Sequence, residues 1–218
     1  MGLDFSVVPG FLDNILIGAL WTIAITLSSA AISFFGGIIL AVIALYGHWA
    51  IRLPFRGFAF LFMGTPLLLQ LFLIYFGLIQ IGIDLPAFVA GIIGLGVHFA
   101  VYNSDIIKAG ILAVDKGQHE GARTIGLSKG QTLRKIIVPQ AVRNVVPPIG
   151  NNTIALLKDS ALVSVIGVTE LTLSAQLAIS QTYRAFEFYV AVAVCYYLIN
   201  LCLEYGLHVI ERRIQIAR

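Results

Sequence analysis

Residues 115–151 read DKGQHEGARTIGLSKGQTLRKIIVPQAVRNVVPPIGN, the longest mainly polar run in a chain that is otherwise strongly apolar. Asp115 followed three residues later by Gln118 predicts a capping box at the start of a helix. Gly126 lies where the C-terminus of a helix favours a residue that tolerates positive φ. The first half of the run therefore predicts a short polar helix with its own start and stop signals.

The second half of the run repeats this pattern. Ser128 with Gln131 is another start signal, and Pro139 is expected to end the segment because it has no N–H group with which to continue a helix. A polar helix–turn–helix between apolar segments has little of its own to bury. It is therefore either a docking surface for another protein or an ordinary solvated loop, and we favour the docking surface.

The composition is that of an integral membrane protein. Hydrophobic residues make up 59% of the 218 residues and charged residues 11%, which is far from the average of soluble proteins. In such a chain the positions of the cations matter more than the net charge of +3, and we expect no nucleic-acid partner. Cys195 and Cys202 lie seven residues apart in one apolar segment, so we interpret them as packing residues.

Five apolar segments are long enough to cross a bilayer, which takes about 20 residues in a helix. We expect an all-α integral membrane protein with a single transmembrane domain over residues 1–218 and a cytoplasmic loop at 115–141. The first segment is interpreted as a retained span, because no basic region and no small-residue cleavage site accompany it. The spans are expected at 14–47, 55–83, 85–107, 142–168 and 187–210.

Two of these spans contain proline signals. The second is broken at Thr65-Pro66, and the fourth contains Pro147-Pro148, where we expect the helix to break early and its irregular backbone to be covered by protein. Residues 169–186 are polar enough to form a loop or a surface helix.

Lys and Arg residues gather on one side of the expected spans. Five spans place the termini on opposite sides, and with the N-terminus outside twelve of the fourteen Lys and Arg residues fall inside. Because cytoplasmic loops carry an excess of Lys and Arg, the C-terminus and the polar run are expected in the cytoplasm. Only Lys158 and Arg184 fall elsewhere; the twelve are Arg52, Arg56, Lys108, Lys116, Arg123, Lys129, Arg134, Lys135, Arg143, Arg212, Arg213 and Arg218.

The polar run also resembles a known family. It has the spacing Glu120-Gly121-Ala122, three residues, Gly126, nine residues and Ile136-Ile137-Val138-Pro139. This spacing resembles the EAA loop of ABC-importer permeases, whose pattern is EAA-x3-G-x9-IxLP; Gly121 replaces the second Ala and Val138 replaces the Leu. The resemblance implies that a separate ATPase contacts this loop, through Glu120, Gly121, Ala122, Arg123, Gly126 and Pro139.

Further segments resemble the polar amino-acid uptake branch of these permeases, and together they cover nearly the whole chain. The resemblance implies the type I, MetI-like fold in a bacterial plasma (inner) membrane. It also implies two ATP-binding subunits that hold ATP and Mg, a second permease that is identical or paralogous, an extracytoplasmic solute-binding protein and an amino-acid substrate. The segments are GTPLLLQ (64–70), YNSDIIKAGI (102–111), GQHEGARTIG (117–126), VPQAVRNVVPPIGN (138–151) and KDSALVSVIG (158–167).

No pattern predicts enzyme chemistry in this chain. The spacing Gly121-x4-Gly126 is followed by Leu127-Ser128 instead of the Lys-Ser/Thr of a phosphate-binding loop, and it follows no expected strand. The histidines have no metal-ligand spacing. We therefore expect no enzymatic activity, cofactor or metal in the chain itself. The histidines are His48, His98, His119 and His208.

A coupling mechanism follows if a helix at 116–125 lies in a groove of a nucleotide-binding subunit. Ala122 would permit close approach, and Glu120 and Arg123, three residues apart, would pair with each other or across the interface. When ATP closes two such subunits, the docked helices move together and tilt the attached spans, as alternating access requires. Five spans are too few to enclose a polar route, so a second permease is implied.

Charged residues inside the expected spans are candidates to line the substrate pathway. A charge near mid-membrane costs at least about 2.5 kcal/mol, so Asp105, Lys158 and Asp159 are hypotheses of function. Alternatively, Lys158 extends to the interface and Asp159 caps a segment that begins at Ser160.

Neutral polar residues in the spans either line the pathway or form hydrogen bonds between helices. The second role is favoured for Thr65 and Ser104. The neutral candidates are Thr65, Gln70, Asn103, Ser104, Asn151, Asn152 and Ser160.

Two positions bear on the choice of solute. Met63 stands where members of the amino-acid branch usually carry Arg, and Asp105 stands where they usually carry Glu. The hypothesis that follows is a pathway for a neutral or cationic amino acid. Two alternatives stay open: an ABC permease for another small solute, and a carrier or channel driven by a gradient.

Overall fold

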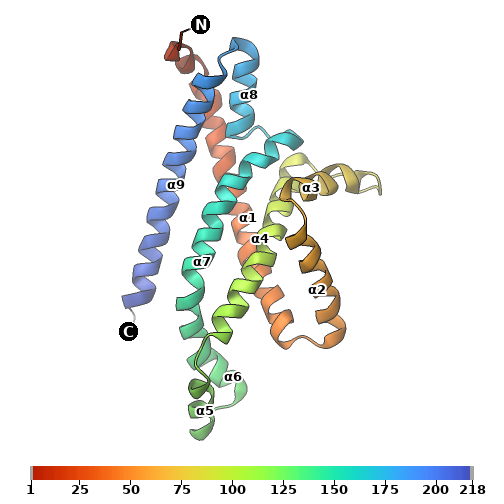
Figure 1. Cartoon of the computed structure of the whole chain (residues 1–218), viewed down its shortest axis with the longest axis vertical. Helices are drawn as coiled ribbons and strands as arrows, with labels where there is room; N and C mark the ends of the chain where they lie inside the picture. The colour runs from red at the N-terminus through yellow and green to blue at the C-terminus, as the bar shows by residue number, and fades with distance from the viewer. Residues whose placement is uncertain (1, 217–218) are drawn as a thin grey trace.

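The fold is built from helices, and the structure, a computed structural model, describes residues 2–216 (Figure 1). Every regular element in that part of the chain is helical, which confirms the predicted all-α class. Arg218, counted above among the basic residues, lies outside it. The elements are η1 (Phe5–Phe11), α1 (Leu12–Tyr46), α2 (Trp49–Gly64), α3 (Leu67–Phe72), η2 (Leu73–Gly77), α4 (Ala87–Leu112), α5 (Lys116–Thr124), α6 (Lys129–Thr132), η3 (Leu133–Ile137), α7 (Val138–Asp159), η4 (Ser160–Ile166), α8 (Leu171–Thr182) and α9 (Ala185–Ile216).

Three helices in this part are long and apolar enough to cross a membrane: Phe5–Tyr46, Ala87–Leu112 and Ala185–Ile214. Two further spans are possible if each of two bent helix pairs counts as one, which gives five. The first pair, α2 with α3 and η2, is bent by 114° at the predicted break, Thr65-Pro66. The second pair joins the continuous helix Lys129–Ile166, which runs from α6 to η4, to α8 with a bend of 49°.

The expected early break at Pro147-Pro148 is wrong. Both prolines lie inside α7, which continues to Asp159. Neighbouring helices can hold a helix that lacks two N–H groups, and α7 packs against α1, α4 and α9. The irregular turn comes later, at the 3-10 helix η4 and at Gly167, whose φ of +89° suits a residue without a Cβ.

Pro139 does not end a helix either. Helical backbone continues from α6 through the π-helical turn η3 into α7, and Pro139 lies in the first turn of α7. Proline is tolerated in a first turn, where its N–H group would have no intrahelical partner. The π-helical turn η3 shifts the register of the backbone hydrogen bonds, so that a new first turn, that of α7, begins inside a continuous helix.

Residues 169–186 are more ordered and more buried than a loop or a surface helix. They contain α8, which places Leu171, Ala175 and Ala178 in a core with Ile15 of α1 and Phe188 of α9. The exposed residues of α8 are mostly polar, with Gln176, Ser180 and Gln181 beside Leu177, so the sequence suggested exposure although one face is fully packed.

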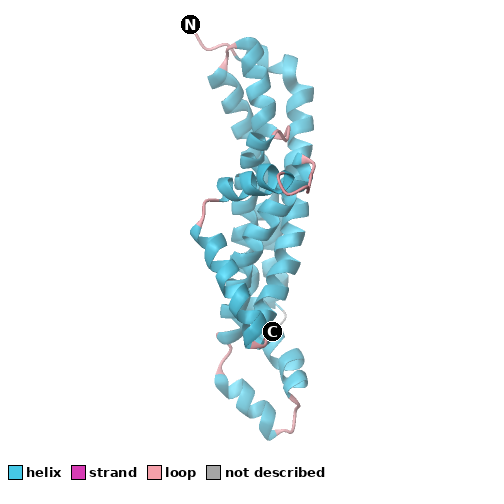
Figure 2. Ribbon diagram, turned by 90° about the vertical axis from the view of Figure 1, so that its right-hand side faces the viewer, coloured by secondary structure: helices cyan, strands magenta, loops and turns pink. Residues whose placement is uncertain are grey.

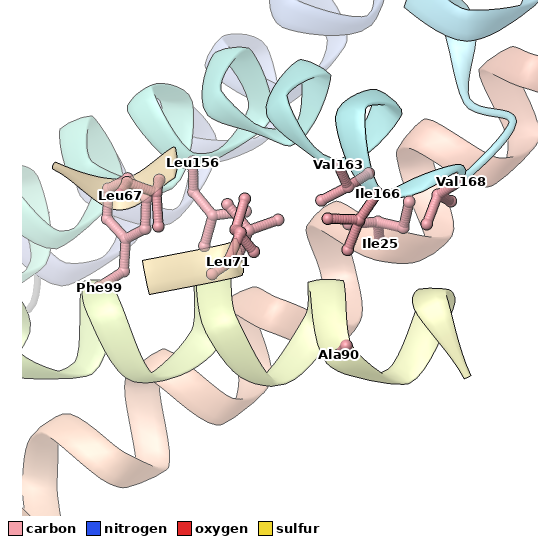
Figure 3. Close-up of a cluster of buried hydrophobic side chains, with 10 residues drawn as sticks. Ile25, Leu67, Leu71, Ala90, Phe99, Leu156, Val163, Ile166 and Val168 are labelled. Carbon is pink, nitrogen blue, oxygen red and sulfur yellow. The ribbon is translucent and has the colours of Figure 1, made fainter. Parts of the chain in front are cut away.

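The main core joins the first four spans. Its side chains come from α1, α3, α4, α7, η4 and the segment that follows η4, and Figure 3 shows Leu71 of α3 lying between α4 and α7. α1 and α4 pack so closely that a Cβ atom at Gly96 would lie 2.7 Å from Cγ2 of Ile32. The buried residues are Ile25, Leu67, Leu71, Ala90, Leu95, Phe99, Leu156, Val163, Ile166 and Val168.

The molecule is elongated, and its two ends differ (Figures 1 and 2). The N-terminus and α8 lie at one end. α5 and α6 project from the opposite end, toward which the C-terminal part of α9 also runs.

Candidate coupling helices and polar sites of the spans

α5 begins with a side-chain cap. Oδ1 of Asp115 accepts a hydrogen bond from the N–H group of Gly117 at 2.6 Å. The predicted capping box is incomplete, because Oε1 of Gln118 accepts instead from Nε2 of Gln140 at 3.2 Å. Gln118 therefore ties α5 to the start of α7, a contact across 22 residues that a local pattern does not contain.

α5 ends in a Schellman turn at the predicted glycine. Gly126 has a φ of +77°, its N–H group donates to the carbonyl of Arg123 at 3.0 Å, and that of Leu127 donates to the carbonyl of Ala122 at 3.0 Å. These two bonds define the motif. The predicted stop signal is confirmed.

α6 begins with the complete capping box predicted from Ser128 and Gln131. The N–H group of Ser128 donates to Oε1 of Gln131 at 2.9 Å, and that of Gln131 donates to Oγ of Ser128 at 3.3 Å. Both short helices are therefore fixed by their own side chains, although nearly all of their residues are exposed.

Ala122 does not have the exposed position expected of a residue that permits close approach of a partner. It is 1% exposed and is the one buried residue of α5. The exposed surface beside it consists of Glu120, Gly121 and Arg123. A Cβ atom at Gly121 would have no neighbour within 4 Å, so in this chain the open space lies over Gly121.

Glu120 and Arg123 are not paired with each other. The ion pair found among the described side chains is Arg184–Glu187, at the other end of the molecule. The charges of Glu120 and Arg123 therefore remain exposed and available to another chain. A small apolar cluster of Val114, Ile137 and Ala141 fixes the base of the projecting unit.

Gln70 is a structural residue of the bent second span. It is 5% exposed, and its Nε2 donates to the carbonyls of Phe62 and Thr65, at 2.7 and 3.0 Å. Its Oε1 accepts from Nδ1 of His98 at 2.9 Å. Gln70 thus satisfies backbone groups freed at the Thr65-Pro66 break and ties that break to α4.

Asn103 connects three spans. Its Nδ2 donates to Oγ of Ser33 in α1 at 3.1 Å, and its Oδ1 accepts from Nδ2 of Asn152 in α7 at 3.0 Å. Asn103 itself is 1% exposed. Ser104 and Ser160 are also buried, and each donates to a carbonyl three residues earlier. Asn103 and Asn152 therefore bond between helices, whereas Ser104 and Ser160 bond within their own helical segments.

The remaining pathway candidates have accessible side chains. Lys158 contributes to a groove of about 550 Å³ between α7 and α9, and Asp159 is half-buried at the end of α7. Asp159 makes no side-chain cap bond, because the chain stays helical into η4 and leaves no free N–H groups there. The pathway candidates with exposed side chains are Met63, Thr65, Asp105, Asn151 and Lys158.

Sequence reasoning missed Glu170, a carboxylate that is fully buried. It caps α8 by accepting from the N–H groups of Thr172 and Leu173, at 2.9 and 3.1 Å. Its Oε2 also accepts from the hydroxyl of Tyr196 in α9 at 2.5 Å. The signal was present: an acidic residue directly before an apolar periodic segment predicts a helix N-terminus.

The N-terminal end has a smaller polar cluster. The N–H group of Asp4 donates to Oε1 of Glu187 at 2.9 Å, and Arg184 donates to the carbonyl of Gly2 at 2.8 Å. Hydrogen bonds from Ser6 to the Asp4 carboxylate lower the pKa of Asp4 below its usual value. This cluster fixes η1 against the start of α9.

Known transport permeases are similar to this chain over nearly its whole length. The chain is 36% identical over 223 residues to the arginine transport system permease protein ArtQ of Bacillus subtilis, covering 99% of each. It is 33% identical over 222 residues to the glutamine transport system permease protein GlnP of Escherichia coli, covering 99% of this chain and 100% of GlnP.

Solved structures share the fold. A crystal structure of an amino acid ABC transporter with histidines matches with a TM-score of 0.92 and 38% identity, over 98% of this chain and 100% of that one. The MetNI methionine ABC transporter in an inward-facing conformation matches with a TM-score of 0.76 and 20% identity, over 93% and 97%, which shows the fold alone.

Residues 33–216 match the family described as binding-protein-dependent transport system inner membrane component. Systems of this kind include an ATPase and a solute-binding protein. The chain therefore belongs to this family, as a multi-pass inner membrane permease of an ABC importer, a transport subunit and not an enzyme.

Proposed function

We propose that this permease imports amino acids and that α5 and α6 receive motion from a separate ATPase. The observation that carries the proposal is the projecting helix pair, whose caps keep it folded while Glu120, Gly121 and Arg123 stay exposed at its surface. The two charges are unpaired with each other, and a groove in a partner could approach closely over Gly121.

The substrate class follows from the relatives. Two are named as permeases for arginine and for glutamine, and a solved relative is described as an amino acid transporter with histidines. None of these names is that of an acidic amino acid, in agreement with the hypothesis drawn from Met63 and Asp105. We propose a neutral or cationic amino acid.

Lys158 and Asp159 are the residues proposed to contact the solute. An amino acid carries a carboxylate and an ammonium group, and these neighbours at the end of α7 offer one complementary charge to each. Lys158 faces the groove between α7 and α9, and Asp159 is partly accessible beside it. The buried network around Asn103 would hold α7 in place beneath them.

The proposed orientation has the N-terminus outside and the C-terminus in the cytoplasm. Its support is the distribution of cations. α5, α6 and η3 together carry five Lys and Arg residues. α5 and α6 project from the end toward which α9 also runs, whereas the N-terminus lies at the opposite end (Figure 1).

The proposed assembly has two permeases, identical or paralogous, and two ATPase subunits. α9 and α1 expose most of their apolar surface, since only 17% and 22% of their most apolar windows are buried within the chain. Lipid and a second permease would share this surface. Each permease would offer one α5–α6 unit to one ATPase subunit.

Reconstitution tests the proposal. The permease is placed in liposomes with its ATPase and binding protein, and uptake of labelled arginine, glutamine and glutamate is measured. We expect uptake only with ATP and ATPase, and weaker competition by glutamate than by neutral or basic amino acids. Uptake driven by an ion gradient alone would contradict the proposal, and uptake confined to a solute of another class would contradict the amino-acid assignment.

Crosslinking tests the contact itself. In a variant with Cys195 and Cys202 replaced by Ala, we expect Gly121→Cys to crosslink to the ATPase in membranes. Leu3→Cys is the matched control, because it is 67% exposed at the opposite end of the molecule. Capture by both positions, or by neither while uptake continues, would argue against docking at α5.

A further inference from the structure

A cavity of about 390 Å³ lies between the C-terminal end of α1 and the α5–α6 pair. It is lined by Tyr46 of α1, His119 and Arg123 of α5, and Lys129 and Thr132 of α6, with leucines completing the wall. The residues that build it come from segments more than 70 positions apart. We call it the basic cavity.

The charge of the basic cavity has one sign. Two permanent cations and one histidine line it, and none of its lining residues is acidic. Among the described side chains, neither Arg123 nor Lys129 is in an ion pair. Two unpaired cations that share a concave surface create a positive potential, which favours an anionic ligand.

The acidic neighbours do not neutralise this surface. Asp115 caps α5 and Glu120 lies in its middle, but neither lines the basic cavity. The carboxylate of Asp115 is occupied by the N–H group of Gly117, and Glu120 lies on the exposed surface that is proposed to meet the ATPase. The cavity and that surface therefore share only Arg123.

The position of the basic cavity points to the membrane surface. Tyr46 is the last residue of the long apolar helix α1 and is 59% exposed, and Trp49, 66% exposed, follows at the start of α2. Tyr and Trp are enriched at the level of the lipid headgroups. Beside Tyr46, the apolar side chain of Val42 is 49% exposed, so this flank of the cavity adjoins lipid.

We propose that the basic cavity binds the phosphate-bearing headgroup of an anionic phospholipid from the cytoplasmic leaflet. The inference rests on the proposed orientation of the permease. Basic pockets beside spans on the cytoplasmic side suit such headgroups, and the volume accommodates a phosphate group with part of its ester. The bound lipid would link the end of α1 to the coupling helices, which no ion pair does among the described residues.

Lipid binding to the purified, complete transporter is the test. The complex is supplied with equal amounts of phosphatidylglycerol and phosphatidylcholine, and bound lipid is counted by native mass spectrometry. We expect preferential retention of phosphatidylglycerol by the unmodified complex. We expect Lys129→Gln to lower that preference about fivefold, which corresponds to about 1 kcal/mol per cation at a membrane surface.

Lys116→Gln is the matched control, because it removes the same charge from an exposed position of α5 outside the cavity. Equal loss in both variants, or no preference in the unmodified complex, would overturn the proposal. A preference for phosphatidylglycerol that appears only when the ATPase is removed would also overturn the proposal. It would mean that an acidic side chain of the ATPase occupies the cavity in the complete transporter. His119→Gln supplies a second variant, because His119 also lines the cavity: we expect a smaller loss than with Lys129→Gln, and no loss would count against the cavity.

This experiment is independent of transport. If all variants keep ATP-driven uptake in liposomes of the same lipid composition, the proposed function stands. The count of bound lipid alone then decides whether the cavity binds a headgroup. Conversely, a transporter that fails to take up amino acids can still be scored for bound phosphatidylglycerol.

Discussion

The start of α8 and the starts of α5 and α6 use the same chemistry in opposite surroundings. In each case a side-chain oxygen accepts N–H groups that the first helical turn leaves free. Glu170 does this in a fully buried position, with a hydroxyl from α9 added, whereas Asp115 and Ser128 do it at the surface. The buried cap is part of the framework, and the exposed caps keep a projecting unit folded without fixing it to the spans.

The largest expected effect is at the buried cap. Glu170→Ala leaves two N–H groups and the hydroxyl of Tyr196 without their acceptor in a dry site, which should cost roughly 3 kcal/mol. Glu170→Gln keeps one acceptor oxygen and should cost less. Thermal unfolding of the detergent-purified permease measures both. If Glu170→Ala unfolded at the same temperature as Asp115→Ala, the distinction between the two regions would fail.

A smaller effect is expected at Tyr196. Tyr196→Phe removes one donor from Glu170 but leaves the two N–H groups in place, so we expect a loss of about 1–2 kcal/mol. The matched control is Tyr197→Phe on the adjacent, exposed position of α9. Unfolding temperatures compared in the same detergent decide the matter, and equal values for the two variants would mean that the Glu170 contact contributes little.

At the exposed end, Gly126→Ala forces a residue with a Cβ to adopt a φ of +77°, which costs about 1–2 kcal/mol. We expect the cost to appear locally, as faster hydrogen exchange in α5, with little change in the overall unfolding temperature. Gly130→Ala is the control, because Gly130 lies within α6 without positive φ. Loss of ATP-driven uptake together with local exchange would link the fold of α5 to coupling, and global unfolding would contradict the separation of the two regions.

The smallest stability effect is expected for Ser128→Ala, about 1 kcal/mol from the loss of one exposed cap. Hydrogen exchange of Gln131 and Thr132 should quicken, while exchange at the start of α8 should stay unchanged. Exchange that quickened in both places would show that the two capped regions are energetically coupled.

Acid should affect a fourth capped start, at η1. Because the pKa of Asp4 in the folded protein is lowered by hydrogen bonds from Ser6, its carboxylate stabilises the fold above the unfolded pKa, and that contribution is lost as pH falls through the folded pKa. We expect Asp4→Asn to flatten the acid dependence of unfolding below about pH 4. If unfolding of the variant depended on acid pH as strongly as unfolding of the unmodified protein, the stabilising role of the Asp4 carboxylate would be contradicted.

The sequence was sufficient for most features defined within a few residues; the exception is Gln118, whose oxygen accepts from Gln140 and not from the start of α5. Ser128 with Gln131, and Gly126 at the end of α5, lie close enough along the chain for their hydrogen bonds to be predicted by spacing alone. The membrane class followed from composition. The match of the EAA pattern gave the family, because its charge, turn and proline positions must all be in register.

Features decided by tertiary packing were predicted poorly. For Gln70 the sequence left two roles open, lining the pathway or bonding between helices, because its partner His98 lies 28 positions away. Pro147 and Pro148 were expected to break a helix that its neighbours hold intact. Glu170 went unnoticed because polar residues around it suggested a loop, and only packing against α1 and α9 shows that the site is dry. Ala122 was assigned to a partner although its own chain covers it.

The uninterrupted passage from α6 through η3 into α7 has a mechanical consequence. A rod from Lys129 to Ile166 is roughly 55 Å long at the rise of a helix. If it pivots near Asn152, which is hydrogen-bonded to Asn103, its two arms are unequal: the long arm reaches the end proposed to meet the ATPase, and the short arm carries Lys158. A large movement of the long arm would then produce a smaller movement at Lys158 with greater force, as in a lever with unequal arms.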